Sequence, residues 1–141
     1  MLCRTPHRGS ERRTAVAAVE LAVLLPFLAF IFVVTVDFSR IFYDSLILNN
    51  CARNGALYGC ANPANSLDTT GIQNAALADA SNLNPTPTVT STTGTNSDGN
   101  YVQVTVTWTF QTITNYPGIP STITLTRTVQ MRVTPQVPDF N

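Results

Sequence analysis

The longest apolar run in the chain, Ala15–Val36, predicts a helix that spans a membrane. It contains one ionisable side chain, Glu20, and one proline, Pro26. About 22 helical residues rise roughly 33 Å, which is enough for a hydrocarbon core of about 30 Å. A proline inside such a span bends the helix without ending it, because neighbouring groups satisfy the freed carbonyl. A buried helix of a soluble protein is the alternative, but the polar second half of the chain offers little core around it.

The helical pattern continues beyond the span and predicts one long helix. Apolar or small residues recur at spacings of three and four, which places them on one helical face: Val34, Phe38, Ile41, Ser45, Leu48, Ala52 and Ala56. Gly59 and then Asn62-Pro63 end this helix, because glycine removes side-chain restraint and proline lacks a backbone donor. Residues Met1–Arg13 show no periodicity and predict a disordered leader, with Thr14 as the helix N-cap.

Two stretches near the C-terminus alternate between apolar and polar residues and predict β-strands. The first runs from Val102 to Phe110, and the second, Ile123–Val133, is interrupted on its apolar side only by Arg127. Pro117-Gly118 between them predicts a turn, so residues 101–133 form an antiparallel hairpin. A hairpin alone is marginal in water, and the exported part of the helix is its expected cover. Arg127 either pairs with an acid such as Asp44 or extends its charged end at the edge of the sheet.

The segment between helix and hairpin has weaker signals. Thr69–Leu83 predicts a short helix, and the prolines after it open an extended segment, Thr86–Thr92. Asp98-Gly99 predicts a turn, and Asp68 a loop or helix-capping residue. The expected fold is therefore α+β, with a long N-terminal helix packed on a small C-terminal antiparallel sheet. The expected domains are a basic leader (1–15), the transmembrane helix with its exported extension (16–61) and an exported α+β domain (62–141).

Charge sets the expected orientation of the span. Four arginines precede it, against one acid, Glu11: Arg4, Arg8, Arg12 and Arg13. An excess of arginine in a short flanking segment marks the cytoplasmic side, so everything after Asp37 is expected to be exported. A cleaved secretory signal is the alternative, but its apolar region should run only about 7 to 15 residues and end in an A-x-A-like site.

The search for catalytic chemistry returns little. The chain has one histidine, His7, which lies in the leader, so no exported Ser–His or Cys–His system or His-containing metal site is expected. The formal net charge is zero and only 11% of residues are charged, so no nucleic-acid footprint is expected. We therefore predict no enzymatic activity, no cofactor, no metal and no small-molecule substrate.

Two of the three cysteines, Cys51 and Cys60, lie on the exported side, where disulfides persist. On one continuous helix their nine-residue separation gives about 13.5 Å of rise, whereas bridged Cα atoms lie about 4.4–6.8 Å apart. A bridge would require the helix to break near Asn54-Gly55. A disulfide within the chain, two free and partly buried thiols, and contacts between subunits all stay open.

Glu20 is the one residue of the span that requires a functional explanation. It lies five residues into the apolar run, where an acidic side chain is still costly. One interpretation is that its side chain extends back to the cytoplasmic interface. The other is that it pairs with a cation on a neighbouring subunit.

An ordered set of motifs resembles the TadE-like proteins of bacterial tight-adherence pilus systems. It comprises Val19-Glu20, Leu24-Leu25-Pro26, Asp37-Phe38-Ser39-Arg40 and Ala52-Arg53-Asn54-Gly55. The resemblance covers roughly residues 12–60 and leaves the following 80 residues without an assignable motif. It implies a pilin-like chain with a basic leader, a cleavage point and a glutamate at the fifth mature position.

The resemblance also implies roles for particular residues. A prepilin peptidase would cleave between Ala15 and Val16, although Ala15 stands where such leaders usually have glycine. Glu20 and Pro26 would serve subunit assembly, with the amino group of Val16 as the cation that Glu20 of an adjacent subunit neutralises. The helix motif residues would be Asp37, Phe38, Arg40, Arg53 and Gly55.

The implied function is a minor pilin, pseudopilin or assembly component of a tight-adherence, type IV-related pilus or secretion machine. Its partners would be the membrane, other pilin-like subunits and pilus assembly proteins. It would lie in the bacterial cytoplasmic membrane, with the C-terminal domain periplasmic or extracellular. The alternative is a membrane-anchored exported β-rich binding domain unrelated to pili. A secretion ATPase, a prepilin peptidase and a small major pilin in the genomic neighbourhood would favour the pilus component.

Overall fold

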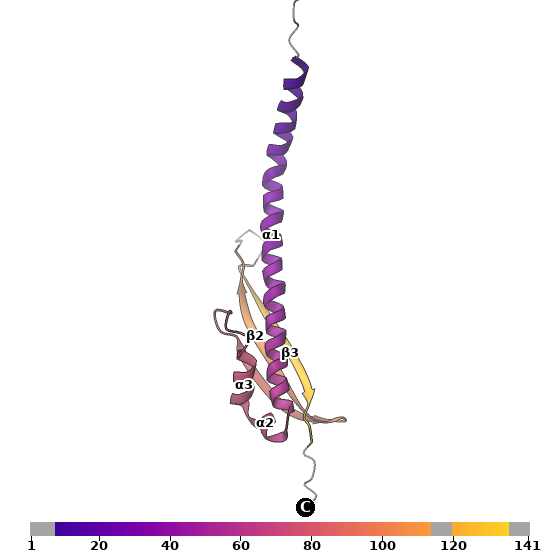
Figure 1. Cartoon of the computed structure of the whole chain (residues 1–141), viewed down its shortest axis with the longest axis vertical. Helices are drawn as coiled ribbons and strands as arrows, with labels where there is room; N and C mark the ends of the chain where they lie inside the picture. The colour runs from indigo at the N-terminus through magenta and orange to yellow at the C-terminus, as the bar shows by residue number, and fades with distance from the viewer. Residues whose placement is uncertain (1–7, 114–119, 136–141) are drawn as a thin grey trace, which may run out of the picture. The chain divides into compact units, whose positions relative to one another are not determined.

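The computed structural model describes residues 8–113 and 120–135, with the side chains described from Ala15 onward. Its elements in chain order are α1 (Arg8–Cys60), α2 (Pro63–Leu67), α3 (Thr69–Leu77), β1 (Thr88–Asn96), β2 (Gly99–Gln111) and β3 (Thr122–Arg132) (Figure 1). The predicted α+β class, a long helix followed by a small antiparallel sheet, is confirmed. Two compact units divide the chain, Met1–Phe38 and Ser39–Asn141, so each is described by itself.

Helix α1 begins at Arg8, so the predicted start near Thr14 is wrong. The prediction of a disordered leader is also wrong for Arg8–Arg13, while residues 1–7 lie outside the described part of the chain. Arginine and glutamate are good helix formers, and the single glycine at position 9 costs only about 1 kcal/mol. The helix ends at Cys60, between Gly59 and Pro63, as predicted.

In the first unit, α1 is an uninterrupted helix whose apolar side chains are exposed. Pro26 lies inside the helix, and the Thr35 hydroxyl donates to the Ile31 carbonyl one turn earlier (2.8 Å). Val23, Phe27 and Phe32 are 69%, 60% and 69% exposed. Among the described residues, one helix is long and apolar enough to cross a membrane. These side chains therefore find no apolar surroundings within the described part of the chain.

The second unit contains a three-stranded antiparallel sheet in the order β1-β2-β3. Strands β2 and β3 form the predicted hairpin, with Val104 opposite Val129, and the turn predicted at Pro117-Gly118 lies outside the described residues. The extended segment predicted at Thr86–Thr92 is a third strand, β1, which continues to Asn96. The turn predicted at Asp98-Gly99 is confirmed, and Gly99 has a φ of 112°, which glycine adopts without strain.

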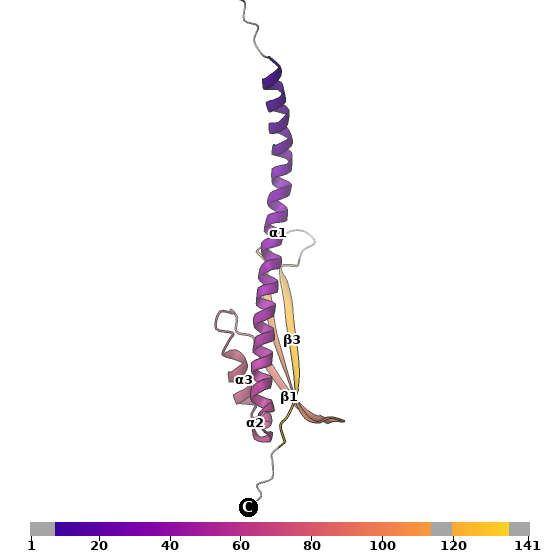
Figure 2. The same ribbon diagram turned by 45° about the vertical axis from the view of Figure 1, so that its right-hand side comes forward.

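The apolar face of the sheet is covered by the second-unit part of α1 and by α3 (Figure 2). The shared core includes small or apolar residues of α1 (Leu48, Cys51, Ala52 and Ala56), two of α3 (Ile72 and Ala76) and the inward residues of β2 (Val102, Val104, Val106, Trp108 and Phe110). The backbone amide of Thr134 donates to the Cys60 carbonyl (2.9 Å), which joins the end of α1 to the segment after β3. The predicted helix cover of the hairpin is therefore present.

The connection between α1 and the sheet differs from the prediction. Helix α2 was missed, although Asn62 caps it by accepting a hydrogen bond from the Asn65 amide (2.8 Å) and Pro63 occupies its first turn. The same Asn-Pro pair that ends one helix starts the next, because proline at the first helical position needs no donor. Helix α3 ends at Leu77 rather than Leu83, yet Ala80 and Leu83 remain buried in the turns that follow.

Candidate functional site

The residues predicted for processing and assembly lie on exposed positions of α1 in the first unit. Ala15, Val16, Val19 and Glu20 line a shallow pocket of about 300 Å³. Val16 and Glu20 are four residues apart, so they share one helical face, and Val16 is 59% exposed. Pro26 is six residues beyond Glu20, a spacing that places it on a different face. The helix thus brings Val16 and Glu20 together but leaves Pro26 apart from them.

The Asp37-Phe38 pair ends the first unit, and its two side chains differ sharply in exposure. Asp37 is only 5% exposed, whereas Phe38 is 69% exposed. The side chains of neighbouring helical residues point about 100° apart, so Asp37 and Phe38 lie in two different environments. Phe38 thus presents its ring to surroundings outside the described part of the chain, and Asp37 does not.

Arg40 belongs to the packing of the second unit. Its guanidinium carbon lies 5.0 Å from the centroid of the buried Phe110 ring, within the range of a cation–π contact. Trp108 meets the same ring edge-on, with centroids 6.1 Å apart. Burial raises the pKa of Asp44, one turn further along α1, and the positive charge of Arg40 opposes that rise. Arg40 therefore stabilises the end of the sheet next to α1.

A cavity of about 370 Å³ adjoins this aromatic pair and is lined by Arg40, Asn84, Pro85, Trp108, Phe110 and Gln111. The Trp108 indole N–H donates to the Pro85 carbonyl, which fixes the ring at the wall of the cavity. A buried indole normally requires such a partner. Three of the lining side chains, Arg40, Trp108 and Phe110, are thus already used in holding the fold.

Gly55 allows α1 to lie close to its neighbours in the second unit. A Cβ atom added there would lie 3.1 Å from the Ala76 Cβ and 3.2 Å from the Ile72 carbonyl oxygen, closer than ordinary van der Waals contact. The carbonyl oxygen of α3 is backbone and cannot move aside cheaply. Arg53, two residues before Gly55, is exposed, and packing within the described part of the chain does not explain an arginine at this position. Of these two helix motif residues, the fold therefore explains Gly55.

A cap that joins α1 to α3 was only partly anticipated. Asp68 accepts hydrogen bonds from the Gly71 amide (2.9 Å) and the Tyr58 hydroxyl (2.8 Å), which confirms its predicted capping role. Both hydrogen bonds lower the pKa of Asp68, and the bond from the Gly71 amide has the larger effect. The bond to Asp68 also raises the pKa of Tyr58. The hydrogen bond of the Tyr58 hydroxyl was not predicted, because nothing in the sequence around Tyr58 indicates that its side chain contacts the N-cap of α3.

Cys51 and Cys60 are free thiols, so the disulfide left open above is not formed. Cys51 is fully buried, and its burial together with the nearby charge of Asp79 raises the pKa of its thiol. Cys60 is half-buried, donates to the Leu57 carbonyl (3.4 Å) and lies 3.9 Å from the Met131 sulfur. The continuous helix keeps the two thiols apart.

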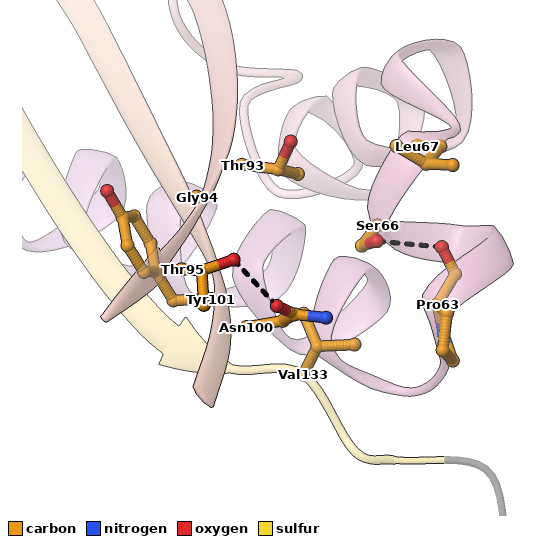
Figure 3. A pocket seen from close by; sticks show the side chains of 9 residues that line it. All are labelled: Pro63, Ser66, Leu67, Thr93, Gly94, Thr95, Asn100, Tyr101 and Val133. Carbon is orange, nitrogen blue, oxygen red and sulfur yellow. Dashed lines mark hydrogen bonds between the residues drawn. The ribbon is translucent and has the colours of Figure 1, made fainter. Parts of the chain in front are cut away.

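A groove of about 270 Å³ lies between α2, the β1–β2 hairpin and Val133, the residue after β3 (Figure 3). In this groove the Ser66 hydroxyl donates to the Pro63 carbonyl (2.7 Å), and the Thr95 hydroxyl lies 2.8 Å from the Asn100 amide oxygen. The side chains of Ser66, Thr95 and Asn100 thus already have partners within the chain. Within the described ranges, no group of histidine, cysteine and acidic residues could hold a metal ion.

The comparison with known proteins bears on the helix. Residues 15–57 match the family model TadE, described as TadE-like protein. No curated protein and no solved structure matches the chain. The matched segment lies entirely within α1 and ends before α2, so the sheet lies outside it. The predicted resemblance is therefore confirmed over the part of the chain that carried it: the helix from Ala15 to Leu57 is TadE-like.

Proposed function

We propose that this protein is a pilin-like component of a tight-adherence, type IV-related pilus or secretion machine, as a minor pilin, pseudopilin or assembly factor. The observation that carries the proposal is the TadE-like segment, residues 15–57. Its role follows from its sequence and exposure: an apolar helix with exposed side chains and one carboxylate, Glu20, on the face of Val16. Such a helix anchors the chain in the membrane and offers a side to other subunits.

Glu20 supplies specificity to that association. Lipid tails are as apolar as leucine, so helices in a bilayer gain little hydrophobic free energy by pairing. A carboxylate in the span pairs with a cation or extends to the interface. Cleavage before Val16 by a prepilin peptidase would create an α-amino group on the same helical face as Glu20, and an adjacent subunit would then meet both charges on one surface.

The four arginines before the span orient it with the N-terminus in the cytoplasm and the sheet domain outside. A reporter enzyme that is active only outside the cytoplasm, fused after Asn141, is therefore expected to be active. A reporter that is active only inside should be silent at the same position. Cytoplasmic activity of the second fusion would contradict the orientation and, with it, the exported domain.

The assembly role is tested by isolating the chain from membranes that express the pilus system. Membranes are solubilised in a mild detergent, the protein is captured by a C-terminal tag, and its partners are identified by mass spectrometry. We expect pilin-like subunits or pilus assembly proteins to co-purify, and a tagged single-pass protein of another system serves as the control. Membrane insertion without any such partner would favour the anchored binding domain instead.

A further inference from the structure

The outer edge of β3 exposes a regular row of backbone groups. The Val133 amide donates to the Asn100 carbonyl (2.8 Å), and the Thr112 amide donates to the Ser121 carbonyl (3.1 Å). In an antiparallel ladder the hydrogen-bonded pairs alternate, so the odd-numbered residues of β3 bond to β2 and the even-numbered ones face outward. The N–H and C=O groups that point away from the sheet therefore belong to Thr122, Thr124, Thr126, Thr128, Gln130 and Arg132.

The two edges of the sheet are not equivalent. At the β1 edge, the Gln73 side chain of α3 donates to the outward carbonyl of Val89 (3.3 Å). Helix α3 and strand β3 lie on opposite sides of α1 in both views (Figures 1 and 2). The even-numbered side chains of β3 are all exposed. Within the described part of the chain, no other element pairs with the outer edge of β3, and an open edge is a template for another strand.

Arg127 occupies the middle of this edge. One guanidinium nitrogen donates to the outward carbonyl of Thr126 (2.8 Å), and another donates to the Ser45 hydroxyl of α1. A strand that pairs along the whole edge must donate its own N–H to the Thr126 carbonyl and so displace the Arg127 guanidinium from that oxygen. The displaced guanidinium then needs another acceptor at the same place, because a partly buried charge is costly without one.

The charges of the strands decide which kind of partner can supply that acceptor. None of β1, β2 and β3 contains an aspartate or glutamate. A second copy pairing through β3 would bring a second Arg127 and no carboxylate, so like charges would meet. We propose that the β3 edge binds an extended segment of another protein, with alternating apolar residues and a carboxylate placed opposite Arg127. The arginine disfavours self-pairing and selects the acidic partner.

The test uses the full chain in detergent micelles and a fluorescein-labelled peptide of eleven alternating threonine and valine residues with a central glutamate. A matched peptide has lysine in place of the glutamate, and a third has the sequence of β3 itself. Fluorescence anisotropy should show that the glutamate peptide binds at least about tenfold more tightly than either control, the scale of a charge-assisted hydrogen bond. Equal binding of the lysine peptide would overturn the charge selection, and equal or tighter binding of the β3 peptide would show that the edge serves a second copy.

Two substitutions locate the site on the edge. Thr124→Pro removes an outward N–H and leaves the ladder to β2 intact, so it should reduce binding of the glutamate peptide at least about tenfold. Thr93→Pro removes an outward N–H from the β1 edge and should leave binding unchanged. Arg127→Gln should reduce the preference for glutamate over lysine to about twofold or less.

Circular dichroism and the fluorescence of Trp108, the single tryptophan, establish that each variant keeps its fold. Undiminished binding by a folded Thr124→Pro variant would overturn the proposal. So would the absence of binding by the wild-type chain at about 1 mM glutamate peptide, since strand-addition partners bind more tightly than that.

Discussion

Replacing Trp108 with serine is expected to lower the free energy of unfolding of the sheet domain by about 3–5 kcal/mol, the range for losing a buried large aromatic side chain. Trp108 is 8% exposed and packs edge-on against Phe110. Its indole also donates to the Pro85 carbonyl, so the substitution removes a hydrogen bond as well as apolar contact. Serine fills little of the space and leaves that carbonyl without its donor. The loss should therefore reach beyond the ring to the segment before β1.

The matched control is Thr107→Ser, on the opposite face of the same strand. The Thr107 hydroxyl lies 3.4 Å from that of Thr126, and serine keeps a hydroxyl at this position. Its effect should stay below about 1 kcal/mol, as for most surface substitutions. Urea unfolding of the full chain in micelles, followed by circular dichroism, measures both variants. Similar losses from the two would mean that both faces of β2 are tightly packed.

Strands were predictable where their two faces differ. Strand β2 alternates strictly because its even residues from Val102 to Phe110 are buried in the core, whereas its odd residues are half-buried or exposed. In β1, only Val89 is a buried apolar residue, and the other positions are threonine, serine, glycine and asparagine on either side. Period-two alternation is therefore absent, and the sequence predicted an extended segment without a partner. The register to β2 is a tertiary property that local pattern does not contain.

The environments of Gly55 and Arg127 likewise depend on tertiary packing that local sequence does not specify. The family resemblance singled out Gly55, but only the structure shows that Ile72 and Ala76 of α3 lie where its side chain would be. Arg127 was expected to meet Asp44 or to extend its charged end at the edge of the sheet, and it donates to the outward carbonyl of Thr126 at that edge and to Ser45, the residue after Asp44. Adjacent helical residues differ by about 100° in direction, so the crossing angle of α1 over β3 decides between them. A sequence does not specify that angle.

Glu20 carries the assembly hypothesis, and replacing it with leucine should separate insertion from assembly. Leucine is favourable inside a bilayer whereas an acidic residue is costly, so the variant should insert as well as the wild type or better. If Glu20 neutralises the amino group of a neighbouring Val16, the partner cation is left without its counter-charge. By analogy with broken buried pairs in soluble proteins, the expected penalty is about 3–5 kcal/mol. Assembly should therefore fail at normal membrane levels.

The measurement is co-purification of the Glu20→Leu variant with the pilus-system partners of the wild type, at matched amounts in the membrane. Val19→Leu is the control, since Val19 borders the same exposed pocket and its substitution changes no charge. Glu20→Gln keeps the size of the side chain and loses the charge, so it should fail as leucine does if pairing depends on ionisation. A carboxylate that only extends to the cytoplasmic interface has no partner cation to lose. Undiminished association of both Glu20 variants would therefore assign Glu20 to the interface, and contacts elsewhere on the helix would have to hold the subunits together.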